Sequence, residues 1–319
     1  MSCIIGNSRA VQGLRALIEV AAPSHLPVLI QGPTGAGKEL VAAALHSASG
    51  RAGRFVAFNV CAIGDSMFED ALFGHVRGAF TGALSDSPGL LREADRGTVF
   101  FDEISGLHAP LQAKLLRAIE LQEFRPVGAN RDVRSAFRFI AATNEPIDRL
   151  VDAGRFRSDL AHRIGAVVIH VPPLVHRRED IRELALHFLS RDNTVGASID
   201  DDAVRVLQHH TWPGNIRELK QVVEWACVLG GGRVSARVVE LALSQRVVTE
   251  RAVERVSDDA REYVELRALL DAHRWDTESA ARALGVHRAT LYRRMKRNQL
   301  VAPFNARGVD AASAAVIGG

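Results

Sequence analysis

A short glycine-rich stretch that ends in a lysine has the residue types needed to bind a polyphosphate. An apolar run at residues 28–30 precedes it, and a segment of helical character at residues 40–47 follows it. In such a turn the glycines let backbone N–H groups close on phosphates, the helix N-terminus adds partial positive charge, and the lysine reaches the outer phosphates. We therefore predict a nucleotide-binding loop, against the alternative of a turn that merely joins a strand to a helix. The residues of this loop are Gly32, Pro33, Thr34, Gly35, Ala36, Gly37, Lys38 and Glu39.

Two adjacent acids, Asp102 and Glu103, end a β-prone apolar run that starts at Gly97. Beside a phosphate-binding loop, the first acid can hold Mg²⁺ through water, and the second can polarise the water that attacks a phosphoryl group. Strands often end in polar residues, so the pair is informative chiefly together with the loop upstream. The general loop pattern places a hydroxyl residue for magnesium after the lysine, and Glu39 stands there instead. We therefore expect Mg²⁺ to rest chiefly on Asp102, water and the phosphates.

The elements that must position these residues alternate between strands and helices. Further strands are expected at residues 55–59, 137–142 and 167–171, and helical periodicity separates them. The alternation predicts a parallel sheet with helices on both faces, in which ligands bind at the carboxyl ends of the strands. After the double proline at residues 172–173 the pattern becomes helical, with helices expected at about 201–210, 214–229 and 235–244.

The last part of the chain has the charge and the pattern of a DNA-binding module. No acid occurs between residues 280 and 300, and two short helices, at 277–284 and 288–297, are joined by a turn at Gly285. This arrangement is typical of a helix-turn-helix that binds double-stranded DNA, and we prefer it to a solvated helical hairpin. The residues expected to face DNA are His287, Arg288, Thr290, Arg293, Arg294 and Arg297.

Composition limits the class of protein. The 319 residues are enough for two or three domains, and the 47% hydrophobic and 24% charged residues are ordinary for a folded soluble protein. No apolar run reaches the roughly 18 residues of a membrane span, and the N-terminus lacks the layout of a secretory signal. Cys3, Cys61 and Cys227 are isolated, which argues against a disulfide framework or a thiolate metal site. We expect a cytoplasmic protein with no membrane partner.

A glycine-containing loop interrupts the expected helices before the acidic strand. Its sequence, Gly78-Ala79-Phe80-Thr81-Gly82-Ala83, cannot form a stable helix interior and presents a phenylalanine and a threonine at its tip. This hexapeptide is the GAFTGA signature of the sigma-54-dependent transcriptional activators, the bacterial enhancer-binding proteins, which the chain resembles. Residues 72–75, 97–103 and 212–219 are similar to the same family, and the C-terminal helices resemble its Fis-type DNA-binding domain.

The resemblance covers nearly the whole chain and implies an AAA+ ATPase that assembles as a ring, usually a hexamer. ATP hydrolysis would move the loop at residues 78–83 against sigma-54 and remodel the closed promoter complex of the RNA polymerase holoenzyme into an open one. The implied cofactors are ATP and Mg²⁺. The implied partners are the sigma-54 RNA polymerase holoenzyme, double-stranded DNA at an enhancer-like upstream site, and further copies of the chain.

The resemblance also implies roles for individual residues. Asp102 and Glu103 match the magnesium-binding and water-activating acids, and Asn59 matches the partner that holds the glutamate idle in one nucleotide state. Asn144 matches the first sensor and Arg217 the second, whereas Arg157 and Arg163 match the arginine fingers that reach the ATP of a neighbouring subunit. From chemistry alone, Arg157 and Arg163 would be taken for surface arginines near a helix start.

The fold class expected is α/β, with an AAA+ P-loop parallel sheet sandwiched by helices, a helical lid subdomain and a C-terminal all-α helix-turn-helix domain. We expect the ATPase core at residues 1–173, the lid at 174–245, a linker at 246–258, the helix-turn-helix at 259–301 and a disordered tail at 302–319. Family members usually have Glu at the positions of Ala71 and Ser158 and aromatic residues near Ala161 and His162. The change at Ser158 could alter how the finger region pairs across the interface.

Two other functions remain open at this point. The chain could be a DNA-binding regulator that acts by occupancy without hydrolysis, or a general AAA+ remodelling ATPase that acts on another protein. We also expect no N-terminal sensory domain in this protein. Control would then come from a separate regulatory protein or from the level of expression.

Overall fold

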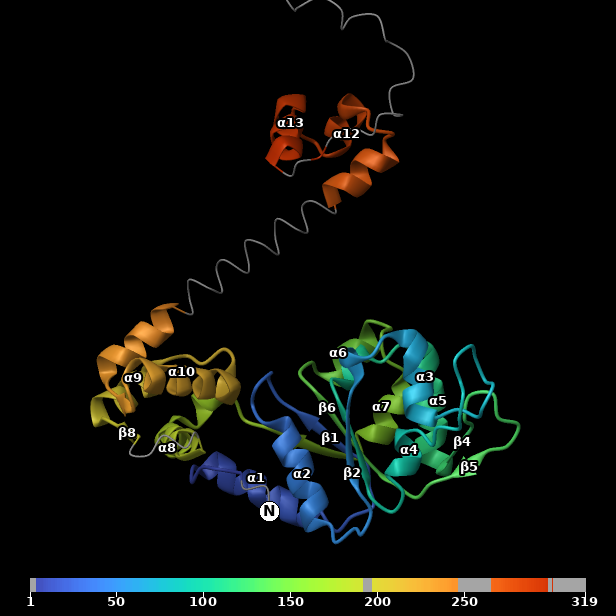
Figure 1. Ribbon diagram of the computed structural model, residues 1–319, viewed down its shortest axis with the longest axis horizontal. Coiled ribbons are helices and arrows are strands. Elements are labelled where there is room, and N and C mark those ends of the chain that lie inside the picture. The colour runs from blue at the N-terminus through green and yellow to red at the C-terminus, as the bar shows by residue number, and fades with distance from the viewer. Residues whose placement is uncertain (1–3, 192–196, 246–264, 298–299, 301–319) are drawn as a thin grey trace, which may run out of the picture. The chain divides into compact units, whose positions relative to one another are not determined.

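The computed structural model describes residues 4–191, 197–245, 265–297 and 300 of the chain. The chain divides into two compact units, Met1–Ala242 and Leu243–Gly319, which are treated separately below (Figure 1). The expected linker at 246–258 and the expected tail at 302–319 lie outside the described residues. In the described part of the chain, no helix has both the length and the apolar character that crossing a membrane requires.

A five-stranded parallel sheet forms the centre of the first unit, with the strand order β2-β3-β6-β1-β7. The three central strands are buried almost throughout, as expected of a parallel sheet covered on both faces, whereas the edge strands β2 and β7 have exposed positions. All carboxyl ends meet at one edge, where Asn59 stands level with Asp102 and Gln31 with Thr143. The strands are β1 (Val28–Gln31), β2 (Phe55–Asn59), β3 (Thr98–Asp102), β6 (Arg138–Thr143) and β7 (Val167–His170).

Helices cover both faces of this sheet and give the sandwich that the alternating pattern predicts (Figure 1). On one face α1 (Arg9–Ala21) and α2 (Lys38–Ala48) pack against side chains such as Ile30 and Phe100. On the other face the neighbouring positions of the same strands, such as Val99 and Phe101, pack against the remaining helices. Those helices are α3 (Asp65–Phe73), α4 (Leu90–Glu93), α5 (Ala109–Leu121), α6 (Ile147–Asp152) and α7 (Ser158–Ile164).

A short antiparallel hairpin between α5 and β6 was not expected from the sequence. Its strands, β4 (Glu123–Phe124) and β5 (Val133–Arg134), are only two residues long each. Strands of that length carry no alternating pattern, so periodicity cannot identify them. The sequence predicted no bounds for the helices α6 and α7, because each has too few residues for a clear helical period.

The lid follows β7 and is mostly helical. Trp212 is fully buried in it and donates its indole N–H to the carbonyl of Leu207. A two-stranded parallel sheet of β8 (Ser198–Ile199) and β9 (Arg233–Val234) was not expected. The helical elements are η3 (Leu174–His176), η4 (Arg178–Asp180), α8 (Ile181–Arg191), α9 (Asp201–His209), α10 (Asn215–Leu229) and a helical stretch at residues 236–245.

The second unit holds a helical stretch at residues 265–272 followed by α12 (Thr277–Ala283) and α13 (Arg288–Arg297). Asp276 caps α12 by accepting from the backbone N–H groups of Glu278 and Ser279. Gly285 turns the chain between the two helices with a positive φ of 66°. Leu291 and Met295 of α13 are buried in the core of this unit.

Candidate functional site

The phosphate-binding loop leaves β1 and enters α2, and Lys38 is the first residue of that helix. Its ammonium is 7% exposed and donates to the carbonyls of Gly32 (3.0 Å) and Pro33 (3.5 Å). It also lies 3.9 Å from a carboxylate oxygen of Glu103. A lysine curled over its own loop in this way stands over the N-terminus of α2, where an anion is favoured by the helix dipole.

Gly35 is required by the lid as well as by the loop. Its φ is +75°, and a Cβ there would lie 2.2 Å from the carbonyl oxygen of Gly214 in the lid. The Gly35 carbonyl accepts from the backbone N–H groups of Ile216 (3.0 Å) and Arg217 (3.3 Å) at the start of α10. The loop and the lid therefore meet backbone to backbone, and any side chain at residue 35 would separate them.

Asp102 and Glu103 end β3 at the edge of the sheet that faces this loop. Both side chains are half-buried, and Asp102 accepts from the backbone N–H of Glu103. Glu103 has a left-handed backbone with φ of 54°, which is uncommon for a residue with a side chain. Burial raises the pKa of the Glu103 carboxyl above its usual value, although the Lys38 ammonium opposes that rise. The two acids thus have different environments within one site.

The two asparagines at the sheet edge make different contacts. Asn144 follows β6 and donates its side-chain amide to the hydroxyl of Thr34 in the phosphate loop, at 3.4 Å. Asn59 instead accepts from the backbone N–H of Cys61 at 2.9 Å, which begins a short turn after β2. Among the described residues no hydrogen bond joins Asn59 to Glu103. The structure thus brings Asn144 to the loop and leaves Asn59 level with Asp102, without a hydrogen bond to Glu103 among the described residues.

One cavity of about 1120 Å³ unites the phosphate loop, both acids and the lid. Thr34 to Val41, Asp102 and Glu103 line its polar part, and Arg217 and Lys220 of α10 add positive charge. Its apolar lining comes from Ile4, Ile5, Leu14, Val171, Leu184 and Phe188. One part of the cavity is polar and charged, and the other is lined by aliphatic and aromatic side chains. Such a cavity suits a ligand with a charged tail and a flat apolar body.

Asn215 and Arg177 belong to this site and were missed in the sequence. Asn215 is 3% exposed, donates to the carbonyl of Thr34 (3.0 Å) and accepts from the backbone N–H of Leu174 (2.9 Å). Arg177 is 2% exposed and donates to the carbonyl of Ala36 (2.9 Å). The motif at residues 212–219 pointed to the neighbourhood of Asn215, but no local pattern marks Arg177.

Arg157 immediately precedes α7 and Arg163 lies in its last turn, and neither is among the residues that line the cavity. Arg157 precedes the helix and forms a bidentate pair with Asp159, at 3.0 and 2.7 Å. Its pKa is raised by this carboxylate. Arg163 is exposed in the last turn and has no hydrogen bond or ion pair with any described residue. Both guanidinium groups are therefore at the surface of a single chain.

The loop at residues 78–83 is anchored at a tightly closed base. A Cβ on Gly74 would lie 2.2 Å from the carbonyl oxygen of Ser87, and one on Gly89 would lie 2.3 Å from the backbone nitrogen of Gly74. The tip is open by contrast, because no atom lies within 4 Å of a Cβ built on Gly78 or Gly82. Phe80 remains 46% exposed, with its ring edge-on to that of His75 at 5.0 Å.

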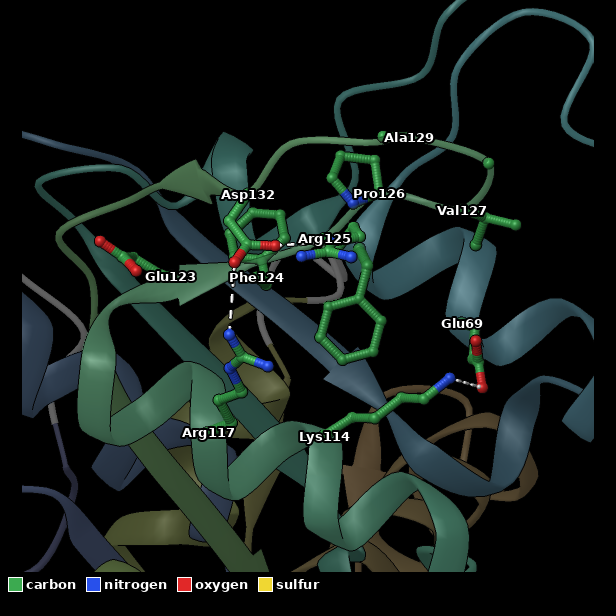
Figure 2. A pocket seen from close by; sticks show the side chains of 12 residues that line it. Glu69, Lys114, Arg117, Glu123, Phe124, Arg125, Pro126, Val127, Ala129 and Asp132 are labelled. Atoms are coloured by element: carbon green, nitrogen blue, oxygen red, sulfur yellow. Dashed lines mark hydrogen bonds and ion pairs between the residues drawn. The ribbon is translucent and has the colours of Figure 1, made fainter.

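The unexpected hairpin lies directly against this loop. Val127 accepts from the backbone N–H of Val76 (3.1 Å) and donates to the carbonyl of Gly74 (2.8 Å). Residues of α3, α5 and the hairpin line a pocket of about 400 Å³. Figure 2 shows the side chains of this pocket. Arg117 and Arg125 converge on Asp132 there, and Lys114 reaches Glu69. The base of the loop and the hairpin are thus hydrogen-bonded to each other.

The residues expected to face DNA lie on α13 or just before it, and they differ in exposure. Arg293 is exposed, and Arg288 is exposed and lies over the ring of Tyr292, 5.6 Å from its centroid. His287 is exposed but caps the helix by accepting from the backbone N–H of Ala289. Thr290 and Arg294 are half-buried rather than fully outward. Arg297 ends α13, and its side chain lies outside what the structure describes.

Three family models match consecutive parts of the chain. Residues 4–170 match the sigma-54 interaction domain, residues 175–255 the AAA+ ATPase lid domain, and residues 260–297 the Fis family of bacterial regulatory proteins. The chain belongs to the sigma-54-dependent transcriptional activators. The family and the fold class expected from the sequence are confirmed, and the AAA+ domain of this activator is an ATPase.

Known relatives agree with this assignment. The activator is 41% identical over 305 residues to the transcriptional regulatory protein ZraR of Klebsiella oxytoca, covering 92% of this chain and 68% of that protein. It is 43% identical over 243 residues to the anaerobic nitric oxide reductase transcription regulator NorR of Vibrio vulnificus, covering 75% and 48%. The crystal structure of NtrX from Brucella abortus with ADP has a TM-score of 0.70 at 33% identity, covering 93% and 69%.

The site of this activator fits a magnesium nucleotide. Mg²⁺ is commonly held by one or two carboxylates together with substrate phosphates and water. In the described part of the chain no three or more His, Cys, Asp or Glu side chains gather to hold a metal ion by themselves. Asp102 is a half-buried carboxylate that lines the same cavity as Lys38.

Proposed function

We propose that this activator hydrolyses ATP in the cavity between phosphate loop and lid and uses the energy to press the loop at residues 78–83 against sigma-54. The result would be conversion of the closed promoter complex of the sigma-54 holoenzyme into an open one. The observation that carries the proposal is a continuous series of contacts between the nucleotide cavity and the loop at residues 78–83. Asn144 contacts Thr34 at the end of β6, β6 continues backward into the hairpin, and Val127 of the hairpin bonds the base of the loop.

The residues of the cavity would divide the chemistry among them. Gly32 to Gly37 would present backbone N–H groups to the phosphates, with Glu39 at the rim, and Lys38 would turn from its own carbonyls toward the outer phosphates. Asp102 would hold Mg²⁺, which neutralises charge on the transferring phosphoryl group. Glu103 would orient and deprotonate the attacking water, and Asn144 would sense the outer phosphate. Arg217, on α10 of the lid, would contact the bound nucleotide and so make the position of the lid depend on it.

A ring of copies would complete the site. Arg157 and Arg163 are exposed on one chain, and an arginine supplied across a subunit boundary stabilises charge in phosphoryl transfer. A head-to-tail interface that closes on itself gives a ring, and we propose a hexamer. Arg157 would have to leave Asp159 on assembly. Asn59 would engage Glu103 in one nucleotide state, a contact that requires its side chain to leave Cys61.

The second unit would localise the activator at its promoters by binding upstream double-stranded DNA through α13. Because chromosomal DNA and RNA polymerase are the partners, we place the protein in the cytoplasm. A separate regulatory protein would control its activity. Co-purification of a stable partner from cells supports that control, whereas constitutive activity without a partner would point to control by expression.

The test of the proposed function is open-complex formation in a reconstituted system of sigma-54 holoenzyme, promoter DNA and the full chain. We expect stable open complexes with ATP and none with a non-hydrolysable analogue. Activation that is equal with both nucleotides, or that needs no nucleotide, would instead support a regulator that acts by occupancy. Remodelling of other proteins with no effect on this holoenzyme would support a general AAA+ factor.

Replacing Arg293 and Arg294 together with alanine should weaken binding to the upstream DNA site. Each lost phosphate contact should reduce the slope of log K against log salt by about 1, since fewer counterions are released. Titration of labelled DNA at several salt concentrations measures both effects. Arg267→Ala, on the helical stretch at 265–272, is the matched control. An unchanged isotherm in the double variant would remove α13 from the DNA interface.

A further inference from the structure

Arg177 is a buried cation whose hydrogen-bonding capacity is only partly used. It lies between η3 and η4 at the start of the lid, 2% exposed, and burial lowers the pKa of its guanidinium. One terminal nitrogen donates to the carbonyl of Ala36 in the phosphate loop at 2.9 Å. Its Nε is buried and has no hydrogen-bond partner among the described residues. Such a donor in an apolar surrounding is unfavourable unless something else accepts from it.

The acid that acts electrostatically on Arg177 is hydrogen-bonded to another segment of the chain. Asp180 attracts the guanidinium electrostatically. Its carboxylate accepts, however, from the backbone N–H groups of Asn7 and Ser8, both at 2.8 Å, and from the Ser8 hydroxyl at 2.6 Å. These bonds hold the N-terminal segment against the lid and use three of the roughly four acceptor positions of the carboxylate. No hydrogen bond joins Asp180 to Arg177 among the described residues. The guanidinium is therefore held in place with a donor to spare.

The unused donor belongs to a residue of the nucleotide cavity. Arg177 lines it together with Ile4, Ile5, Val171, Leu184 and Phe188. The Asp180 contacts fix Asn7 and Ser8 on the lid, and Ile4 and Ile5 just before them line the same cavity as Arg177. Aliphatic and aromatic walls of this kind accommodate the flat face of a nucleobase but supply it with no polar contact. Of these side chains, only the Arg177 guanidinium has a hydrogen-bond donor for the edge of a base, although His187 of α8 also lines the cavity.

We propose that Arg177 donates a hydrogen bond to an unprotonated ring nitrogen of the purine base. Arg177 is then a specificity-determining residue of the nucleotide site. The guanidinium has donors and no acceptor, so it suits a ring nitrogen and is repelled by an exocyclic amino group. The same guanidinium also donates to the carbonyl of Ala36 in the phosphate loop. Binding of the base would therefore be coupled to the conformation of the phosphate loop. This inference rests on the proposed binding of ATP and adds the group that reads its base.

The test measures affinity of the full chain for ADP and for 1-deaza-, 3-deaza- and 7-deaza-ADP, each of which replaces one ring nitrogen by a C–H. ADP avoids hydrolysis. We expect one analogue to bind about tenfold or more weakly, the loss expected for a hydrogen bond from a charged donor. The other two should bind like ADP. If all three analogues bind like ADP, the proposal is wrong although the nucleotide site stands.

A thermodynamic cycle that combines a variant with the sensitive analogue tests whether Arg177 donates the hydrogen bond that the analogue lacks. Arg177→Met keeps most of the side-chain volume and removes every donor, so the sensitive analogue and ADP should bind it equally. Arg178→Met, at the exposed neighbouring position, is the matched control and should keep the full discrimination. Discrimination that persists in Arg177→Met would overturn the assignment. A purely structural tie between lid and loop would weaken ADP and all analogues by one common factor.

Two further measurements distinguish failure of the Arg177 proposal from failure of the nucleotide site and from misfolding of the variant. If the wild-type chain binds neither ADP nor the analogues, the proposed ATP site itself fails, and Lys38→Ala supplies the reference for that result. If Arg177→Met does not fold, as judged by its thermal melt, Arg177→Lys takes its place in the cycle. Lysine keeps the charge but lacks the planar fork, so it should lose most of the discrimination.

Discussion

Replacing Glu103 with glutamine lowers the rate of ATP hydrolysis by about 10²–10⁴-fold, the contribution expected of a positioned general base. Binding of ATP and of DNA should stay close to wild type, because the side chain keeps its size and leaves the phosphate loop untouched. Open-complex formation should disappear with hydrolysis. Steady-state phosphate release and nucleotide titration on the same preparation measure the two effects separately.

The pH dependence follows from the environment of this carboxyl. Burial raises the pKa of Glu103 in the folded protein, so the ionised form that accepts a proton is lost earlier as pH falls. The acidic limb of the hydrolysis profile should therefore lie above the range of an exposed glutamate, and Glu103→Gln should flatten it. A raised folded pKa gives stabilisation below the unfolded pKa that is lost as pH rises through the folded pKa. Without nucleotide, the variant should gain stability relative to wild type as pH rises from 4 toward neutrality.

Glu120→Gln is the matched control, since Glu120 is an exposed glutamate of α5. It should hydrolyse ATP at the wild-type rate with an unchanged pH profile. A Glu103→Gln variant that hydrolyses ATP within a few-fold of wild type would remove Glu103 from the general-base role. A variant that has lost ATP binding would show that Glu103 acts through Lys38, 3.9 Å away, rather than on water.

Replacing Thr81 with alanine should separate hydrolysis from promoter opening. Thr81 is exposed at the tip of a loop whose base is fixed, and it is remote from the residues that line the cavity. ATPase activity should therefore remain near wild type. Open-complex formation should fall by roughly 30-fold, as expected when about 2 kcal/mol of a central contact with the partner is lost.

Ser85→Ala removes another exposed hydroxyl from the same loop outside residues 78–83 and serves as the control. It should open promoters normally. Normal open-complex formation by Thr81→Ala in the reconstituted system would mean that the loop does not act on sigma-54 through this residue. Equal losses of hydrolysis and opening would instead indicate that the substitution disturbs the cavity, through the hairpin and β6.

Local patterns were sufficient for the elements that carry most of the candidate chemistry. The glycines and lysine at residues 32–39 are contiguous, and the turn between β1 and α2 follows from their order. The acids at 102–103 end a strand long enough to be recognised by its apolar run. The family followed from the hexapeptide at 78–83 and is confirmed by the matched domains. The roles assigned to individual site residues remain predictions.

Other elements were outside the reach of periodicity. The hairpin strands β4 and β5 have two residues each, and α6 and α7 span fewer than two or barely two turns. The expected contact between Asn59 and Glu103 was inferred from family resemblance, whereas the structure places the Asn59 oxygen on Cys61. A side chain at a strand end has several rotamers, and its partner depends on the local backbone.

The sequence by itself determined which chemistry this protein can perform, because phosphate binding and the acid pair depend on residues adjacent in the chain. Tertiary structure decided which distant residues take part. Asn144 meets Thr34 across 110 residues, and Arg177 meets Ala36 across 141. Val127 meets the base of the loop through backbone groups, which no side-chain pattern records. These contacts arise only when the sheet and the lid are packed, since packing alone fixes which surfaces face each other.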